Sequence, residues 1–218
     1  MTPALPIQST AEKLIRQHKK HALANNPPLM VGTSGIDGSG KGYITHQLHT
    51  ALTAQGLRCH TIGCDGWLAL PNKRFANSQS PLDAGEHFYR HGFRYAEMRT
   101  LLLEPLRQFG QIDYTAQHAT PDNSPHFQPY HYQIPPVDIL LVEGIFLFQP
   151  AFKFDYKIWI ECSFDSALQR AITRNQEGLT EEQLILDYKT IYFPAQRVHF
   201  KHDNPTQQAD CILNNETI

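Results

Sequence analysis

The feature that most constrains this chain is a glycine-rich segment from Gly35 to Lys41, which reads G-x-x-x-x-G-K. An apolar run, Leu29-Met30-Val31, leads into it and is typical of a buried strand. Beyond it, one helix face is outlined by the spacing of Ile44, Leu48, Ala51, Leu52 and Gln55. A strand, a glycine loop and a helix in this order form one unit of a parallel sheet, so the segment predicts an α/β fold.

The loop itself is typical of a phosphate-binding site. Its glycines allow backbone N–H groups to converge on phosphate oxygens without clashes from Cβ atoms, and the helix start adds the positive end of a dipole. Lys41 is expected to bind the β- and γ-phosphates of a nucleotide. The expected cradle consists of Gly35, Ile36, Asp37, Gly38, Ser39, Gly40, Lys41 and Gly42. The motif normally ends in a Ser or Thr that binds Mg²⁺, and this chain has Gly42 there.

The remaining pattern alternates strands with helices. Further strands are expected at 57–64, 137–142, 157–162 and 209–213, and together they predict a three-layer fold, a parallel sheet with helices on both faces. Ser9 and Glu12 have the spacing of a helix-capping pair, Asp165 is expected to cap a later helix, and Thr180 with Gln183 fits a capping box for a helix that reaches Tyr192.

The region before the third strand is expected to hold a loop at 69–82 and one long helix. That helix contains Tyr89, Phe93, Ala96, Thr100 and Leu103 at helical spacing, and Pro105 is expected to kink or restart it. Residues 110–136, rich in proline and histidine, are expected to form a loop or a small hairpin on the substrate side, as is the segment 66–82.

Composition bounds the class of protein. A length of 218 residues with 41% hydrophobic content suits one domain spanning 1–218. A formal charge of -2 gives no broad attraction to nucleic acid or to a membrane surface. No apolar run approaches the roughly 20 residues of a membrane span, and the N-terminus does not have the pattern of a signal peptide. We therefore expect a cytoplasmic protein that binds a small molecule.

Two carboxylates follow predicted strands. Asp65 ends the strand at 57–64 and Glu143 ends the strand at 137–142. Because ligands of open parallel sheets bind at the carboxyl ends of strands, both are expected near the glycine loop. Glu143, and with it Asp65, is expected to bind Mg²⁺, and Asp65 and Lys41 are the catalytic candidates. Asp65 can orient an acceptor hydroxyl, which suffices for phosphoryl transfer because that reaction depends mainly on positioning and charge.

Other side chains are candidates for the substrate side. Arg170 and Arg174 lie one helical turn apart and fit a lid near 170–180 that closes over phosphate. Tyr114 and His118 are interpreted as groups that face the substrate. The histidines at 118, 126 and 131 lack metal-ligand spacing and predict no metal site of their own.

Several stretches together resemble a known family. They are Gly32 to Gly35, Gly40-Lys41, Asp65-Gly66-Trp67, Leu141 to Phe146, Asp165 to Arg174, Tyr192 to Ala195 and Ala209 to Ile212. They resemble the uridine kinase family of P-loop kinases, with phosphoribulokinase and bacterial pantothenate kinase as more distant relatives. The resemblance covers most of residues 28–214. It implies transfer of phosphate from ATP or GTP, with Mg²⁺, to the 5′-hydroxyl of uridine or cytidine.

The resemblance also implies roles for particular residues. Asp65 matches the catalytic base of the family, Glu143 its metal-linked acid, and Tyr114 and His118 its nucleoside contacts; Glu86 matches a substrate-contacting acid. Family members are often homo-oligomers.

Other positions depart from the family. Gly42 replaces the hydroxyl residue, the arginine doublet of the lid helix becomes Arg170-Ala171, and Gly66-Trp67 is closer to the Asp-Gly-Phe of pantothenate and sugar kinases. A pantothenate- or sugar-type kinase and a non-catalytic nucleotide-binding protein therefore remain alternatives.

Overall fold

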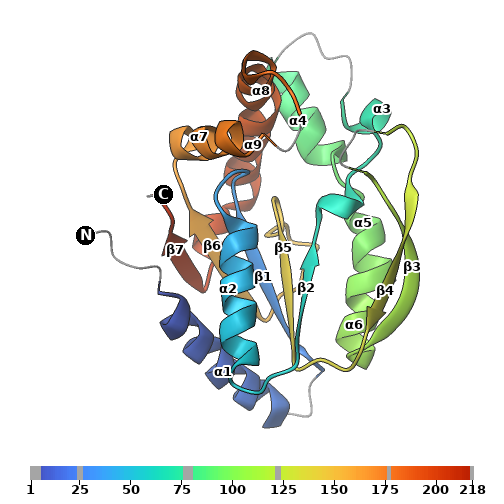
Figure 1. Ribbon diagram of the computed structural model, residues 1–218, viewed down its shortest axis with the longest axis vertical. Coiled ribbons are helices and arrows are strands. Elements are labelled where there is room, and N and C mark those ends of the chain that lie inside the picture. Colours follow the sequence, from blue (N-terminus) through green and yellow to red (C-terminus); the bar gives the residue numbers. More distant parts are fainter. Residues whose placement is uncertain (1–5, 24–26, 76–80, 121–123, 176–177, 217–218) are drawn as a thin grey trace.

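The central sheet has five parallel strands. The computed structural model describes residues 6–23, 27–75, 81–120, 124–175 and 178–216. The strands are β1 (Leu29–Gly35), β2 (Cys59–Gly63), β5 (Ile139–Gly144), β6 (Tyr156–Glu161) and β7 (Cys211–Asn214), in the spatial order β2-β5-β1-β6-β7 (Figure 1). The predicted α/β fold with a parallel sheet is confirmed. β1 lies between β5 and β6, so the order changes direction there, which is the usual ligand position in such sheets.

Helices cover both faces of the sheet. α1 (Ile7–Leu23) and α2 (Lys41–Thr53) lie on one face, where Leu14, Leu48 and Val31 are fully buried together. Alternate residues of β1 point to the opposite face, where Met30 joins a second core. That face is covered by α4 (Pro81–His91), α5 (Tyr95–Met98), α6 (Glu104–Phe109) and α9 (Phe193–Asp203).

The remaining elements lie around the carboxyl edge of the sheet and beside it. α7 (Phe164–Arg174) and α8 (Glu181–Asp187) form a separate cluster near the end of β1, with α9 behind them in Figure 1. α3 (Pro71–Arg74) and α10 (Pro205–Gln208) are short. Within 110–136, where a loop or a small hairpin was predicted, β3 (Ile112–His118) pairs antiparallel with β4 (Gln128–Ile134), and residues 121–123 lie outside the described residues.

Some predicted helix ends are confirmed and others are wrong. Thr180 and Gln183 make both hydrogen bonds of a capping box at the start of α8. Ser9 lies inside α1, because the helix begins at Ile7. Ser163, and not Asp165, caps α7: its side chain accepts the N–H of Ser166 at 3.1 Å.

The predicted long helix is interrupted. α4 ends at His91, and the next residues pair with the segment after Asp65: Ala69 N–H donates to Gly92 O at 2.8 Å, and Arg94 N–H donates to Trp67 O at 2.8 Å. These long-range bonds replace helical ones. The chain then continues through α5, a π-helical turn at Arg99–Leu103 and α6, near whose start Pro105 lies, as predicted. The predicted loop at 69–82 is wrong where α3 and the start of α4 form, and residues 76–80 lie outside the described residues.

Candidate active site

The phosphate loop connects β1 to α2. Gly38 and Gly40 have φ angles of 77° and 87°, a backbone conformation that favours glycine. A Cβ added at Gly38 would lie 2.4 Å from the carbonyl oxygen of Ala167, so α7 packs directly against the loop. Gly40 stands at the N-cap of α2 and no side chain caps this helix. The N–H groups of its first turn therefore remain available to an anion.

Lys41 is the first residue of α2 and is 8% exposed. Its Nζ donates to the carbonyl oxygen of Ile36 at 2.9 Å, which holds the ammonium across the loop. An ammonium has three N–H donors, so two remain for an anion in the cradle.

The two strand-end carboxylates lie beside this loop. Glu143 pairs in register with Thr33 of β1 and with Gly63 of β2, and its Oε1 lies 3.2 Å from the position of a Cβ added at Gly63. Cys64 N–H donates to the backbone oxygen of Glu143 at 2.9 Å, which places Asp65 next to the end of β5. The structure thus brings Lys41, Asp65 and Glu143 to one edge of the sheet.

Burial and neighbouring charges shift the pKa values of both carboxylates. Burial raises the pKa of Asp65; the carboxylate of Asp37 raises it further, whereas Lys41 and Arg174 oppose the shift. Asp65 nevertheless keeps solvent-accessible surface. Burial also raises the pKa of Glu143, with Asp65 and Asp37 adding to the shift and Lys41 opposing it. A cation bound here would offset this crowding of negative charge.

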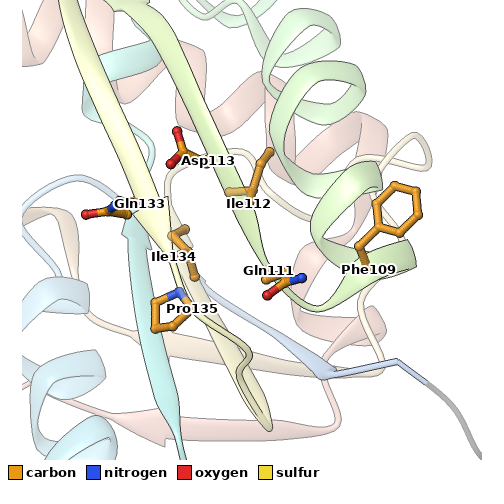
Figure 2. A pocket seen from close by; sticks show the side chains of 7 residues that line it. All are labelled: Phe109, Gln111, Ile112, Asp113, Gln133, Ile134 and Pro135. Atoms are coloured by element: carbon orange, nitrogen blue, oxygen red, sulfur yellow. The ribbon is translucent and has the colours of Figure 1, made fainter.

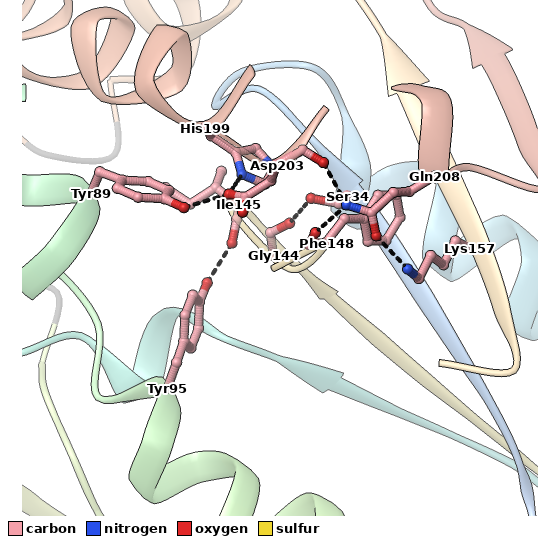
Figure 3. Close-up of polar contacts among 10 residues, drawn as sticks. All are labelled: Ser34, Tyr89, Tyr95, Gly144, Ile145, Phe148, Lys157, His199, Asp203 and Gln208. Carbon is pink, nitrogen blue, oxygen red and sulfur yellow. Dashed lines mark hydrogen bonds and ion pairs between the residues drawn. The ribbon is translucent and has the colours of Figure 1, made fainter. Parts of the chain in front are cut away.

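The turn after Glu143 is fixed from several sides, as Figure 3 shows. Ser34 Oγ donates to Gly144 O at 3.0 Å, and Tyr95 Oη donates to Ile145 O at 2.5 Å. Phe146 has a φ of 59°, an unusual value for a large side chain, and is fully buried among aromatic rings. These contacts hold the end of β5, and with it Glu143, in one orientation.

The same network continues into α9. Asp203 accepts hydrogen bonds from Tyr89 Oη and from Nδ1 of the buried His199, the latter at 2.7 Å. Burial alone would raise the pKa of Asp203, but the hydrogen bonds from these two partners lower it below its usual value. The carboxylate of Asp203 therefore has a structural role next to Phe146.

The hairpin reaches the site at His118. Trp67 Nε1–H donates to Tyr132 Oη at 2.9 Å, and that hydroxyl lies 2.8 Å from His118 Nε2. Because the hydroxyl accepts from the indole, we assign its own proton to His118 Nε2 and the imidazole proton to Nδ1. Burial, with the charge of Arg94, lowers the pKa of His118, which favours this neutral form. Its Nδ1 lies 2.2 Å from the position of a Cβ added at Gly66, beside Asp65.

No protein-family model matches the chain, and no curated protein matches it. Solved structures do match. A candidate fructose transport system kinase from a Silicibacter species has a TM-score of 0.73 at 17% identity, with 94% of this chain and 98% of that chain covered. A possible uridine kinase from Bacillus stearothermophilus has a TM-score of 0.66 at 18% identity, with 92% and 98% covered. D-glycerate 3-kinase from Cryptococcus neoformans has a TM-score of 0.62 at 15% identity, with 88% and 89% covered.

The chain has the fold of the P-loop kinases. At these identities the likeness is one of chain arrangement. The P-loop kinase fold agrees with the order of the sheet and with the loop that follows β1.

The other predicted site residues lie in different parts of this P-loop kinase fold. Tyr114 is half-buried on the hairpin face that also carries Ala116 and His118, and it packs against the core. Glu86 lies on α4 and accepts from Arg90 at 2.6 Å on an exposed surface. Glu86 is not among the charges that act on Asp65. Its role in substrate binding, like that of Tyr114, stays a prediction.

The two arginines of α7 differ. Arg170 donates from Nη1 to the carbonyl oxygens of Ser39 at 3.3 Å and Gly38 at 3.5 Å, so it contacts the outside of the phosphate loop. Arg174 is exposed in the last turn of α7, and its charge acts on Asp65. Both roles on the substrate remain predictions, and two residues of the predicted lid, 176 and 177, lie outside the described residues.

Tyr188 is a site residue that sequence reasoning missed. It is fully buried in the α7–α8 cluster, and its Oη donates to Asp37 Oδ2 at 2.6 Å; Asp37 Oδ1 accepts the N–H of Gly38 at 3.0 Å. The contact ties the segment that follows α8, beyond the predicted lid near 170–180, to the phosphate loop. No local signal could reveal it, because the partners are 151 positions apart.

The residues fit a metal ion that arrives with a nucleotide. Within the described part of the chain, no three His, Cys, Asp or Glu side chains group closely enough to hold a metal by themselves. Mg²⁺ beside phosphates usually needs only one or two carboxylates and several waters. Glu143 and Asp65 could supply the carboxylates, whereas Gly42 supplies no ligand. Bound there, the ion would neutralise charge on the phosphates.

A large surface hollow lies away from this chemistry. Its volume is about 750 Å³, and Figure 2 shows Phe109 and Gln111 on one side of it and Gln133, Ile134 and Pro135 on the other. Gly110, beside Phe109, packs on Pro28, which precedes β1. The hollow is therefore at the amino edge of the sheet, whereas the phosphate loop is at the carboxyl edge.

None of the described helices is both long and apolar enough to cross a membrane.

Proposed function

We propose that this protein is a kinase that transfers the γ-phosphoryl group of ATP to a hydroxyl of a small metabolite. The observation that carries the proposal is the convergence of Lys41, Asp65 and Glu143 at one edge of the sheet, where the charge of Lys41 opposes the rise in the pKa of both carboxylates. A phosphate cradle, an acid for Mg²⁺ and an exposed acid for the acceptor are the parts that phosphoryl transfer needs. The fold shared with three kinases supports the proposal.

Uridine and cytidine are the first acceptors to test, because of the sequence resemblance and the possible uridine kinase among the structural neighbours. A sugar-type acceptor is the second candidate, and a specific observation favours it. His118 Nδ1 lies 2.2 Å from where a Cβ at Gly66 would be. The Asp-Ser step usual in uridine kinases therefore cannot be accommodated here unless His118 moves. The candidate fructose transport system kinase, with its TM-score of 0.73, agrees with this alternative.

The decisive experiment measures ADP release with ATP against a panel of acceptors, with Mg²⁺ and separately with Mn²⁺. The panel contains uridine, cytidine, pantothenate, fructose, glycerate and a no-acceptor control. We expect one class to raise ADP release at least tenfold above the control. Calorimetry with ATP on the same protein gives the binding constant independently of turnover.

The outcomes separate the alternatives. Nucleotide binding without acceptor-dependent ADP release under either metal would support a non-catalytic nucleotide-binding protein. No binding of ATP at millimolar concentration would remove the phosphate loop from the function altogether.

A further inference from the structure

The C-terminal segment contacts the phosphate loop from outside. Asn215 follows β7, and its Nδ2 donates to the carbonyl oxygen of Ser39 at 2.7 Å. Arg170 of α7 donates to the same oxygen at 3.3 Å. The Ser39 carbonyl is thus bound by two side chains that come from two different elements.

These two side chains are also connected to each other. Arg170 Nη2 donates to the backbone oxygen of Asn215 at 2.5 Å, and its Nη1 lies 3.3 Å from Cys162 Sγ. Asn215 N–H donates to Glu161 O at 2.8 Å, which continues the pairing of β7 with β6. Asn215 and Arg170 thus form a clamp on the Ser39 carbonyl. Asn215 is held by its backbone bond to the sheet, and Arg170 belongs to α7.

Glu216 fastens the same segment to the start of α7. Its carboxylate accepts from Ser163 N–H at 2.7 Å, from Ser163 Oγ at 2.6 Å and from Ser166 Oγ at 2.8 Å. The side-chain hydrogen bond from Ser163 contributes most to lowering the pKa of Glu216. The carboxylate thus remains charged, which suits its place at a helix N-terminus.

The clamp has a consequence for the opposite side of the loop. In a trans peptide the carbonyl of one residue and the N–H of the next point in opposite directions. Holding the Ser39 oxygen toward Asn215 and Arg170 therefore turns the Gly40 N–H away from them, to the opposite side of the peptide. Gly40 follows Ser39 at a φ of 87°, a conformation that would otherwise be one of several open to a glycine.

We propose that Asn215 and Arg170 are positioning residues that set the direction of the loop N–H groups for phosphate. The inference rests on the proposed function, since it assigns these residues to the same nucleotide site. Neither residue needs to touch the nucleotide. Their effect passes through the Ser39 peptide, and it acts on the phosphates and not on the base or the acceptor.

The test compares Asn215→Ala and Asn215→Asp with the unmodified protein and with Gln207→Ala. Gln207 is an exposed amide in the same C-terminal region and serves as the matched control. Calorimetry measures binding of ATP and of adenosine. Losing one hydrogen bond is worth a factor of roughly three to ten, so we expect ATP to bind that much more weakly to Asn215→Ala, with adenosine binding unchanged.

The aspartate variant distinguishes positioning from packing. Asn215→Asp keeps the shape of the side chain but replaces the donor by an oxygen that repels the Ser39 carbonyl. We expect it to bind ATP more weakly than Asn215→Ala does. If Asn215→Asp bound ATP as the unmodified protein does, the amide would be only a space filler and the proposal would be wrong.

Amide hydrogen exchange makes the inference independent of nucleotide binding. We expect the backbone amides of residues 38–41 to exchange several-fold faster in Asn215→Ala than in Gln207→Ala, without any ligand. Equal exchange would overturn the inference even if ATP binds. If exchange were faster in Asn215→Ala but the protein did not bind ATP, the result would support the role of Asn215 in holding the loop. It would count against the proposed function.

Discussion

The phosphate loop takes its shape from seven consecutive residues, whereas the surface beside Asp65 is assembled from segments far apart in the chain. The loop needs Gly38 and Gly40 at positive φ and is only supported from outside by α7 and the C-terminal segment. The surface beside Asp65, where we propose that the acceptor binds, depends on a hydrogen-bond relay from Trp67 to Tyr132 to His118, which joins β4 and β3 to the turn after β2. A local motif fixes the first region, and tertiary packing fixes the second.

This difference predicts how the two regions respond to substitution. A change in the loop should alter nucleotide binding and leave acceptor binding nearly intact. A change in the relay should alter acceptor binding together with stability, because two of its members, Trp67 and Tyr132, also belong to the core.

Lys41→Ala is expected to have the largest effect. In the proposed site its ammonium is the cation of the phosphate cradle, and removing such a charge from a preorganised site costs roughly a hundred- to a thousandfold in turnover. The fold should survive, since Nζ makes a single hydrogen bond, to Ile36. Steady-state kinetics and circular dichroism measure the two effects. Lys201→Ala, at an exposed position of α9, is the control, and unchanged kcat/KM in Lys41→Ala would contradict the assignment.

Asp65→Asn comes next. An amide keeps the size of the side chain but cannot accept the hydroxyl proton or orient the acceptor in the same way, which typically lowers kcat by about a hundredfold or more. ATP binding should change little, because the cradle is intact. Kinetics and calorimetry test this, with the exposed Asp165→Asn as control. A near-normal kcat would remove Asp65 from the mechanism.

The pH dependence follows from the same carboxylates. Burial and the charge of Asp37 raise the pKa of Asp65, and the pKa of Glu143 is raised as well. As the pH falls, activity that needs both carboxylates ionised should be lost. This loss should occur at a higher pH than it would if both groups had the pKa of a free carboxylate. Asp37→Asn removes a negative charge, lowers both pKa values and should move the acid limb of kcat/KM to lower pH. If the acid limb of kcat/KM did not move in Asp37→Asn, the charge of Asp37 would not influence the two carboxylates.

The difference between the regions also explains what sequence could predict. The glycine loop, the strand-end position of Asp65 and the capping box at Thr180 are set by neighbours in the chain, and all of these placements are found in the structure. The break after His91 depends on backbone bonds from Ala69 and Trp67, which no local pattern records. α9 (Phe193–Asp203) was not predicted, although Pro194 in its first turn is compatible with a helix start.

Tyr132→Phe tests the acceptor side. The substitution leaves Nε1 of the fully buried Trp67 without its acceptor and His118 Nε2 without its donor. An unsatisfied buried group costs about 1–3 kcal/mol, which for a protein of this size lowers Tm by several degrees. We expect the acceptor KM to rise several-fold with the Kd of ATP unchanged. Tyr130→Phe, at a residue that is 51% exposed, is the control. An altered Kd for ATP would show that the two regions are not separable.

The smallest expected effect is a gain, from Gly42→Ser. A Cβ added at Gly42 meets no atom within 4 Å, so a serine fits without rearrangement and places a hydroxyl where the loop motif usually has one. We expect the Mg²⁺ concentration for half-maximal activity to fall about threefold to tenfold, because the ion gains one protein oxygen. Gly42→Ala separates this from stability: relative to glycine, serine should stabilise α2 by roughly 0.5 kcal/mol and alanine by roughly 0.8–1 kcal/mol, but only serine supplies a ligand. An equal Mg²⁺ requirement in the serine and alanine variants would show that the metal in this protein does not use that side of the loop.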